Sequence, residues 1–141
     1  MIEAANAKYL QALAPISVAG GAGATTTEID TLGFDYAEFI ICLGLVGANG
    51  ITTVKVQESD VAGSGQVDIT GTSFTAPVDA DDNKIGICRL DLRKRKRYLT
   101  LVVTNGATNA SVLGALVRLS RARQVPDTAT DRGATLQELV V

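Results

Sequence analysis

Hydrophobic and polar residues alternate over short segments of this chain, with the two-residue period of half-buried β-strands. In residues 52–58, Val54 and Val56 share one face and polar side chains occupy the other. Residues 97–105 and 111–123 repeat the pattern, each with one continuous apolar face. These segments predict strands that cover a common core.

The strongest strand pattern, residues 36–46 (YAEFIICLGLV), is apolar on more than one face. One parity should face the core and consists of Ala37, Phe39, Ile41, Leu43 and Leu45. The other parity is mixed and consists of Tyr36, Glu38, Ile40, Cys42 and Gly44. We therefore expect this strand to be covered in part on both sides, or to face a neighbouring subunit.

Turn signals separate these runs and define the fold class. Asn-Gly pairs at residues 49–50 and 105–106 predict hairpin turns, because both residues readily adopt positive φ. In residues 84–92 the inward parity shifts, which predicts a β-bulge. About eight strands without a helical crossover indicate an all-β fold, an antiparallel β-sandwich that is jelly-roll-like, over residues 25–125.

The two ends of the chain differ from this body. Residues 1–14 are rich in good helix formers, and Pro15 ends the segment, so we expect a short helix or an extended arm. Residues 20–23 read as a flexible hinge that completes an N-terminal arm, residues 1–24. Residues 126–141 are polar and then apolar, which indicates either a stray end or a C-terminal arm that docks on a neighbour. Its anchor candidates are Leu136, Leu139, Val140 and Val141.

Charge is divided along the chain. Between residues 28 and 82 the only basic residue is Lys55, and between residues 84 and 123 the only acidic residue is Asp91. Such a chain can attract copies of itself or a mixed-charge scaffold. It is less suited to binding a polyphosphate along its whole surface.

The sharpest local feature is a run of five basic residues between two strand patterns. Three interpretations are open: a solvated hairpin connection, a patch of ion pairs with another subunit, and binding of a nucleic-acid backbone. The third interpretation lacks the usual aromatic companions, since Tyr98 is the only aromatic residue nearby. The run consists of Arg93, Lys94, Arg95, Lys96 and Arg97.

Few residues here suit catalysis or cofactor binding. The chain has no histidine to activate a serine or threonine, so we expect it not to be an enzyme and to need no cofactor or metal. The alternate spacing of Asp79, Asp81 and Asn83 lacks the glycine and glutamate of a calcium loop. Cys42 and Cys88 read as buried free thiols, with a disulfide between adjacent strands as the alternative. The longest apolar run, residues 39–46, is too short to span a bilayer.

Four stretches carry a resemblance to a known family. They are FDYAEFIICLGLVG, TVKVQESD, DLRKRKRYLTLVVTNG and VLGALVRLSRARQVP, which together span residues 34–126. In this order the chain resembles the small β-sandwich decoration, or cement, proteins of tailed-bacteriophage capsids. The two ends of the chain lie outside the resemblance.

The resemblance implies a virion structural protein that binds and stabilises a capsid. Its partner would be the major capsid protein, and the protein itself would be a homo-oligomer, with a trimer favoured. It would be assembled in the host cytoplasm and lie on the capsid surface, without binding nucleic acid or membrane. The alternatives are a tail or neck structural protein and an adhesive or carbohydrate-binding sandwich module, although the chain has no tryptophan to stack on a sugar.

Overall fold

The computed structural model describes residues 6–24, 26–123, 128 and 130–137. Within these residues it contains eight β-strands and two 3-10 turns, but no α-helix. The strands are β1 (Lys8–Val18), β2 (Glu28–Asp30), β3 (Phe34–Val46), β4 (Ile51–Ser59), β5 (Val67–Asp68), β6 (Ile85–Asp91), β7 (Tyr98–Asn105) and β8 (Ser111–Ala122). The 3-10 turns are η2 (Asp79–Asp81) and η3 (Leu92–Lys94).

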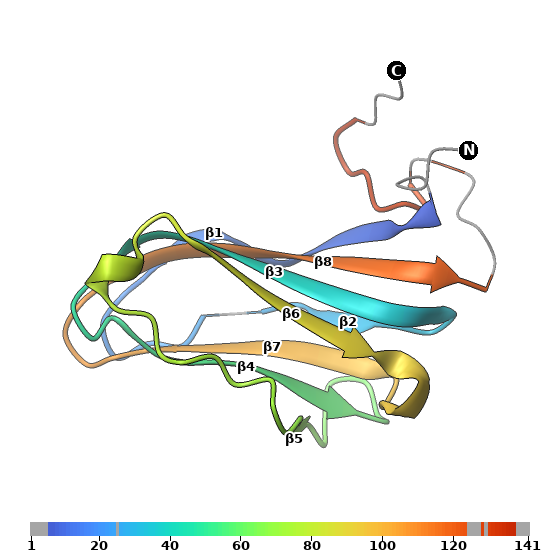
Figure 1. Cartoon of the computed structure of the whole chain (residues 1–141), viewed down its shortest axis with the longest axis horizontal. Helices are drawn as coiled ribbons and strands as arrows, with labels where there is room; N and C mark the ends of the chain where they lie inside the picture. The colour runs from blue at the N-terminus through green and yellow to red at the C-terminus, as the bar shows by residue number, and fades with distance from the viewer. Residues whose placement is uncertain (1–5, 25, 124–127, 129, 138–141) are drawn as a thin grey trace.

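The strands form two antiparallel sheets of four strands each. Sheet A has the order β1-β8-β3-β6, and sheet B has the order β2-β7-β4-β5. The sheets lie one over the other in Figure 1. Except from β4 to β5, each strand is followed along the chain by a strand of the other sheet. The connections therefore cross between the layers.

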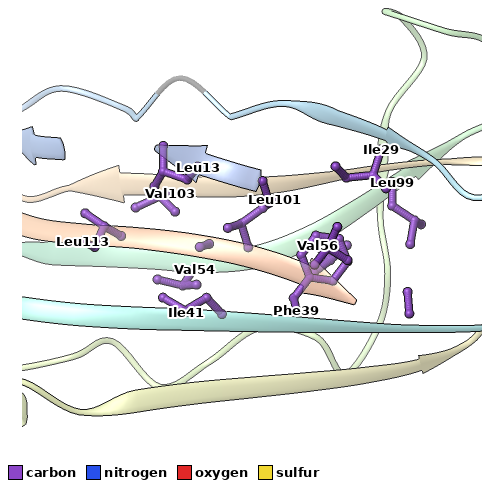
Figure 2. Packing of buried hydrophobic residues seen from close by; sticks show 14 of the residues in the cluster. Leu13, Ile29, Phe39, Ile41, Val54, Val56, Leu99, Leu101, Val103 and Leu113 are labelled. Carbon is purple, nitrogen blue, oxygen red and sulfur yellow. The ribbon is translucent and has the colours of Figure 1, made fainter. Parts of the chain in front are cut away.

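One core fills the space between the sheets. Phe39, the largest fully buried side chain, comes from β3 of sheet A, whereas Leu99 and Leu101 come from β7 of sheet B. Figure 2 shows side chains of both sheets pointing into the same layer. The inward parities predicted for β4, β7 and β8 are confirmed, since their members are almost inaccessible to solvent. They are Val54, Val56, Leu99, Leu101, Val103, Leu113, Ala115, Val117 and Leu119.

The parity predicted for β3 is confirmed except at its end. Ala37, Phe39 and Ile41 are buried, but Leu45 is 66% exposed. The register with β8 shifts between Leu43 and Val46, and this irregularity turns Leu45 outward and Val46 inward.

Strand β6 does not contain the predicted bulge. Its pairing with β3 is regular from Ile85 to Asp91. Cys88 faces the core opposite Phe39, whereas Ile85 and Ile87 face outward. The apparent shift of parity in the sequence arose because this strand is apolar on both faces.

The helix predicted as one alternative for residues 1–14 is wrong for residues 8–14, which belong to a strand. Residues 8–18 form β1, which pairs with β8 inside sheet A. Helix propensity is a weak preference, and here the burial of Ala12 and Leu13 against the core overrides it. Pro15 is tolerated because β1 is an edge strand with register shifts.

The glycine-rich residues 20–23 are tied to β7, which does not fit a free hinge. The N–H of Gly21 donates to the Gly106 carbonyl (2.5 Å), and Asn105 N–H donates to the Ala22 carbonyl (3.0 Å). A Cβ on Gly20 would lie 2.7 Å from the Thr108 carbonyl carbon, so the glycine allows a close backbone approach there. Residues 8–18 thus belong to sheet A, and the backbone of residues 21–24 bonds to β7 and the residue that follows it.

The Asn-Gly pair at residues 49–50 includes a turn, but the pair at residues 105–106 does not, since Asn105 is the last residue of β7 and has no positive φ; neither pair closes a hairpin. Asn49 has a φ of 53°, as expected for such a turn, yet β3 and β4 belong to different sheets, as do β7 and β8. The two corners pack on each other: Gly106 N–H donates to the Gly50 carbonyl (2.8 Å). A Cβ on Gly106 would lie 1.9 Å from the Asn49 carbonyl oxygen, so only glycine fits this contact. The local turn was predictable, whereas its crossing between sheets depends on the whole fold.

Candidate interaction surfaces

The basic run lies at the end of the molecule where the chain crosses from β6 to β7. It includes most of η3, whose first residue, Leu92, is buried. The Asp91 carboxylate accepts a hydrogen bond from Arg93 N–H (3.1 Å) and thereby caps this turn. Because β6 and β7 belong to different sheets, the run is an inter-sheet connection and not the predicted hairpin connection.

Acidic side chains of the same chain pair with most of the run. Arg97 pairs with Asp30 of β2 (2.6 Å), and Arg95 pairs with Glu58 of β4 (3.4 Å). Two further pairs are Arg93 with Asp91 (2.5 Å) and Lys96 with Asp60 (3.4 Å). Lys94 is exposed and forms no ion pair with a described residue. The acidic and basic halves of the chain thus meet within one molecule at this end, which leaves less charge for a partner than the sequence suggests.

These ion pairs keep the carboxylates ionised. The hydrogen bond from Arg97 lowers the pKa of Asp30 below its ordinary value of 3.8. Hydrogen bonds from the Arg93 side chain and backbone lower the pKa of Asp91 to about 2. Both pairs are solvent-exposed, so they fix the geometry of the turn more than they stabilise the fold.

A second cluster of arginines lies on the outer face of sheet A and was not predicted. Here the side chains of β3, β6 and β8 come together in register: Glu38 lies opposite both Arg89 and Arg118. The Glu38 carboxylate is 2.6 Å from Arg89 Nε and 3.9 Å from an Arg118 amino nitrogen. A hollow of about 350 Å³ opens here, with Tyr36 and Ser120 on its wall. We call this the arginine half of the outer face.

Two more arginines extend this half over the ring of Tyr36. The guanidinium carbons of Arg93 and Arg121 lie 5.8 and 5.6 Å from the ring centroid, within the range of cation–π contact. Arg121 has a φ of 52°, in the left-handed region that residues other than glycine rarely adopt. The strand end is therefore strained at the residue that carries this guanidinium group.

The other half of the outer face is apolar. Ile40 of β3 lies between Ile87 of β6 and Leu116 of β8, and in the next row Cys42 lies beside Ile85. Ile85 is 65% exposed, Ile87 45% and Leu116 43%. The apolar half consists of Ile40, Cys42, Ile85, Ile87, Val112 and Leu116. The outward parity of residues 36–44 was predicted correctly as mixed, but its continuation into β6 and β8 required the strand pairing.

The two cysteines differ from the expected pair of buried thiols. Cys42 is exposed on the outer face, so this prediction is wrong for Cys42. Cys88 is half-buried on the core side, and burial raises the pKa of its thiol. Both cysteines are free, and they point to opposite faces of sheet A, which excludes a disulfide between them.

The C-terminal anchor candidates are described only in part. Leu136 is 99% exposed, whereas Leu139, Val140 and Val141 lie outside the described residues. The preceding turn touches the body, since Tyr9 N–H of β1 donates to the Arg132 carbonyl (2.7 Å). This contact places the described end of the chain beside the first strand of sheet A.

The described residues contain no group of three or more Cys, Asp or Glu side chains that could hold a metal ion. In the same part of the chain, no helix has the length and hydropathy that crossing a bilayer requires. No protein-family model matches this chain, and no curated protein matches it.

Proposed function

We propose that the two sheets form a jelly-roll β-sandwich, in which two Greek keys roll into facing sheets. The pairs β1–β8, β2–β7, β3–β6 and β4–β5 are those of one long hairpin folded over on itself. The pairs β3–β8 and β4–β7 then join the halves within each sheet. This fold occurs in viral capsid proteins and in lectins, so it does not by itself select a function.

We propose that the protein is a virion structural protein that binds a phage capsid as a decoration, or cement, protein. The observation that carries the proposal is the outer face of sheet A, where exposed Ile85, Ile87 and Leu116 adjoin a cluster of arginines. A contiguous apolar patch with a polar border is typical of a protein–protein interaction site. The resemblance of residues 34–126 to decoration proteins makes the major capsid protein the expected partner.

Repetition over a symmetric shell suits this kind of surface. Weak contacts that are linked together gain avidity without any strong individual site. The resemblance implies that the protein acts as a homo-oligomer, with a trimer favoured, and bridges neighbouring capsid subunits. We propose that residues 126–141 act as a C-terminal arm in this assembly, and the complete exposure of Leu136 supports such a role.

A tail or neck structural role would use the same surface. An adhesive or carbohydrate-binding role is favoured only by the occurrence of the jelly roll among lectins. On the outer face of sheet A, the Tyr36 ring lies under two guanidinium groups, which compete with a sugar for its π-face. We therefore place the capsid role first.

Binding to intact empty phage heads tests this proposal. The purified protein should co-sediment with heads and raise their survival under heat or osmotic stress. Leu116→Lys should weaken this binding, because it places a charge within the apolar half, whereas Thr53→Lys on the outer face of sheet B should not. Equal survival of heads with and without the protein would reject the cement role and favour the tail or adhesive alternatives.

The charged side chains of the basic run should contribute less to this binding than the apolar half does. Replacing Arg93, Lys94 and Arg95 together by Ser should slow attachment and reduce its salt dependence, since exposed charges act mainly on association. The effect should be modest, because Arg93 and Arg95 already pair with Asp91 and Glu58. A complete loss of attachment with an intact fold would show that the basic run, rather than the apolar half, carries the binding.

A further inference from the structure

The four edge strands of the two sheets differ in how well they are protected against pairing with another chain. Sheet B ends in β2 and β5, which are only three and two residues long. Sheet A ends in β1 on one side and β6 on the other. Short edge strands are one of the devices by which proteins prevent unwanted strand pairing, so the edges of sheet B are protected.

The β1 edge is protected by other means. Its register with β8 shifts at two places, and it contains Pro15, which has no N–H to donate. Other segments already use its backbone: Tyr9 N–H donates to the Arg132 carbonyl, and the Ala12 carbonyl accepts from Thr27 N–H (2.8 Å). An approaching strand would find this edge interrupted and occupied.

The β6 edge has none of these protections over its first half. It is seven residues long, pairs with β3 without a shift, and carries exposed Ile85 and Ile87. Its charged outward residues, Arg89 and Asp91, are confined to the second half. The loop beside it donates from Phe74 N–H to the Val54 carbonyl (2.9 Å) of β4 and packs the Phe74 ring under Gly86. In Figure 1 this loop runs between β6 and sheet B, so it closes the core without pairing with β6.

The alternation of the strand shows which backbone groups of β6 are open. Leu43 N–H donates to the Lys84 carbonyl (2.9 Å), so the next residues that direct N–H and C=O toward β3 are Gly86 and Cys88. The N–H and C=O groups of Ile85, Ile87 and Arg89 therefore point away from sheet A. No backbone hydrogen bond from another described segment reaches them.

We propose that β6 pairs antiparallel with β6 of a second copy of this chain, around a two-fold axis near Ile87. In this arrangement the unpaired backbone N–H and C=O groups of β6 in each copy bond to those of the other. Because the two-fold contact uses the same edge of both copies, it produces a dimer and does not extend to further chains. The pairing would join two copies of sheet A into one eight-stranded sheet. Ile87 would lie beside Ile87 of the second copy, and Ile85 beside its Arg89. The charged second half of β6 disfavours indefinite sliding of the register.

This inference does not depend on the capsid role, because it concerns only how the chain associates with itself. A two-fold contact makes dimers, and the trimer implied by the family resemblance would need another surface. The molar mass of the full chain in solution, measured over a micromolar-to-millimolar concentration series, should rise from that of a monomer to that of a dimer.

Ile87→Pro is the discriminating variant. It removes an N–H that points out of the sheet, so the fold should survive while the dimer is lost. Leu116→Lys is the matched control, since it alters the same outer face on a central strand and should leave the dimer intact. Loss of the dimer in Leu116→Lys with retention in Ile87→Pro would overturn the proposal in favour of face-to-face docking.

Amide hydrogen exchange of the unaltered chain gives an independent test if Ile87→Pro does not fold. Exchange at Ile87 and Arg89 should slow as the concentration rises, whereas exchange at Gly86 and Cys88, which already face β3, should not change. A chain that stays monomeric over the whole series, or a dimer without this alternation, would overturn the proposal.

Discussion

The outer faces of the two sheets differ far more than their inner faces. Both sheets direct Val, Ile and Leu into one core, but the outer face of sheet B is mostly polar. Its rows pair Thr53 with Thr104, Lys55 with Val102 and Gln57 with Thr100. The outer face of sheet A carries apolar side chains and arginines instead. Folding requires only the inner faces to be apolar, so an apolar outer face indicates contact with something else. On this difference we base the proposal that sheet A is the side of the molecule that interacts.

The largest effect on folding is expected from substitutions in β3, where the inner and outer faces should respond differently to a charge. Ile41→Asp should abolish soluble folding, because Ile41 is 2% exposed and a lone buried carboxylate costs several kcal/mol of a total stability of about 5–15 kcal/mol. Ile40→Asp, one residue earlier and on the outer face, should give a folded, soluble protein. Circular dichroism and thermal unfolding of the two variants test this contrast. Equal damage in both would show that the outer face is already buried in the isolated chain.

A smaller effect should come from the strained end of β8. Arg121→Gly relieves the left-handed backbone, whereas Arg121→Ala removes the same guanidinium group and retains the strain. The Gly variant should therefore be more stable than the Ala variant by about 1 kcal/mol. Denaturant unfolding measures this difference, and both variants should bind the partner equally weakly if the guanidinium group contributes to binding. An Ala variant as stable as the Gly variant would mean that Arg121 is not strained.

The smallest effect on the stability of the fold should come from a change of pH. The carboxyl groups of Asp30 and Asp91 have folded-state pKa values below the ordinary 3.8, because Arg97 and Arg93 donate hydrogen bonds to them. A lowered pKa stabilises the fold above about pH 4, and this contribution is lost as the pH falls toward 2. Asp30→Asn and Asp91→Asn should each lower the melting temperature slightly at pH 7, and the difference from the unaltered chain should shrink in acid. A constant difference across this range would mean that neither pair depends on an ionised carboxylate.

Much of the inner face could be predicted from the sequence. Alternation placed Val54, Leu101 and Val117 in the core because burial in a two-sided sheet imposes a two-residue period. The N-terminal strand could not be predicted, since Ala, Leu and Gln near Lys8 favour a helix locally and only pairing with β8 makes the segment a strand. Local preference and global pairing conflict there, and pairing prevails.

The proposed interaction surface could be predicted only in part. The mixed outward parity of β3, from Tyr36 to Cys42, was visible in the sequence. The arginine half needed the register, because Arg89 and Arg118 are far apart along the chain and meet only on either side of Glu38. The basic run was visible as a run, but its acidic partners Asp30 and Glu58 come from β2 and β4, which pair with β7 on either side in sheet B. Long-range pairing, which no local pattern encodes, decides which charges remain available.

Hydrogen exchange of the full chain, compared between the free protein and the protein bound to intact empty heads, would locate the contact surface directly. Amides of β6 and β8 in sheet A should gain protection in the bound protein, whereas those of β4 and β7 in sheet B should not change. Protection centred on β4 and β7, or equal protection of both sheets, would contradict the assignment of sheet A as the interacting side.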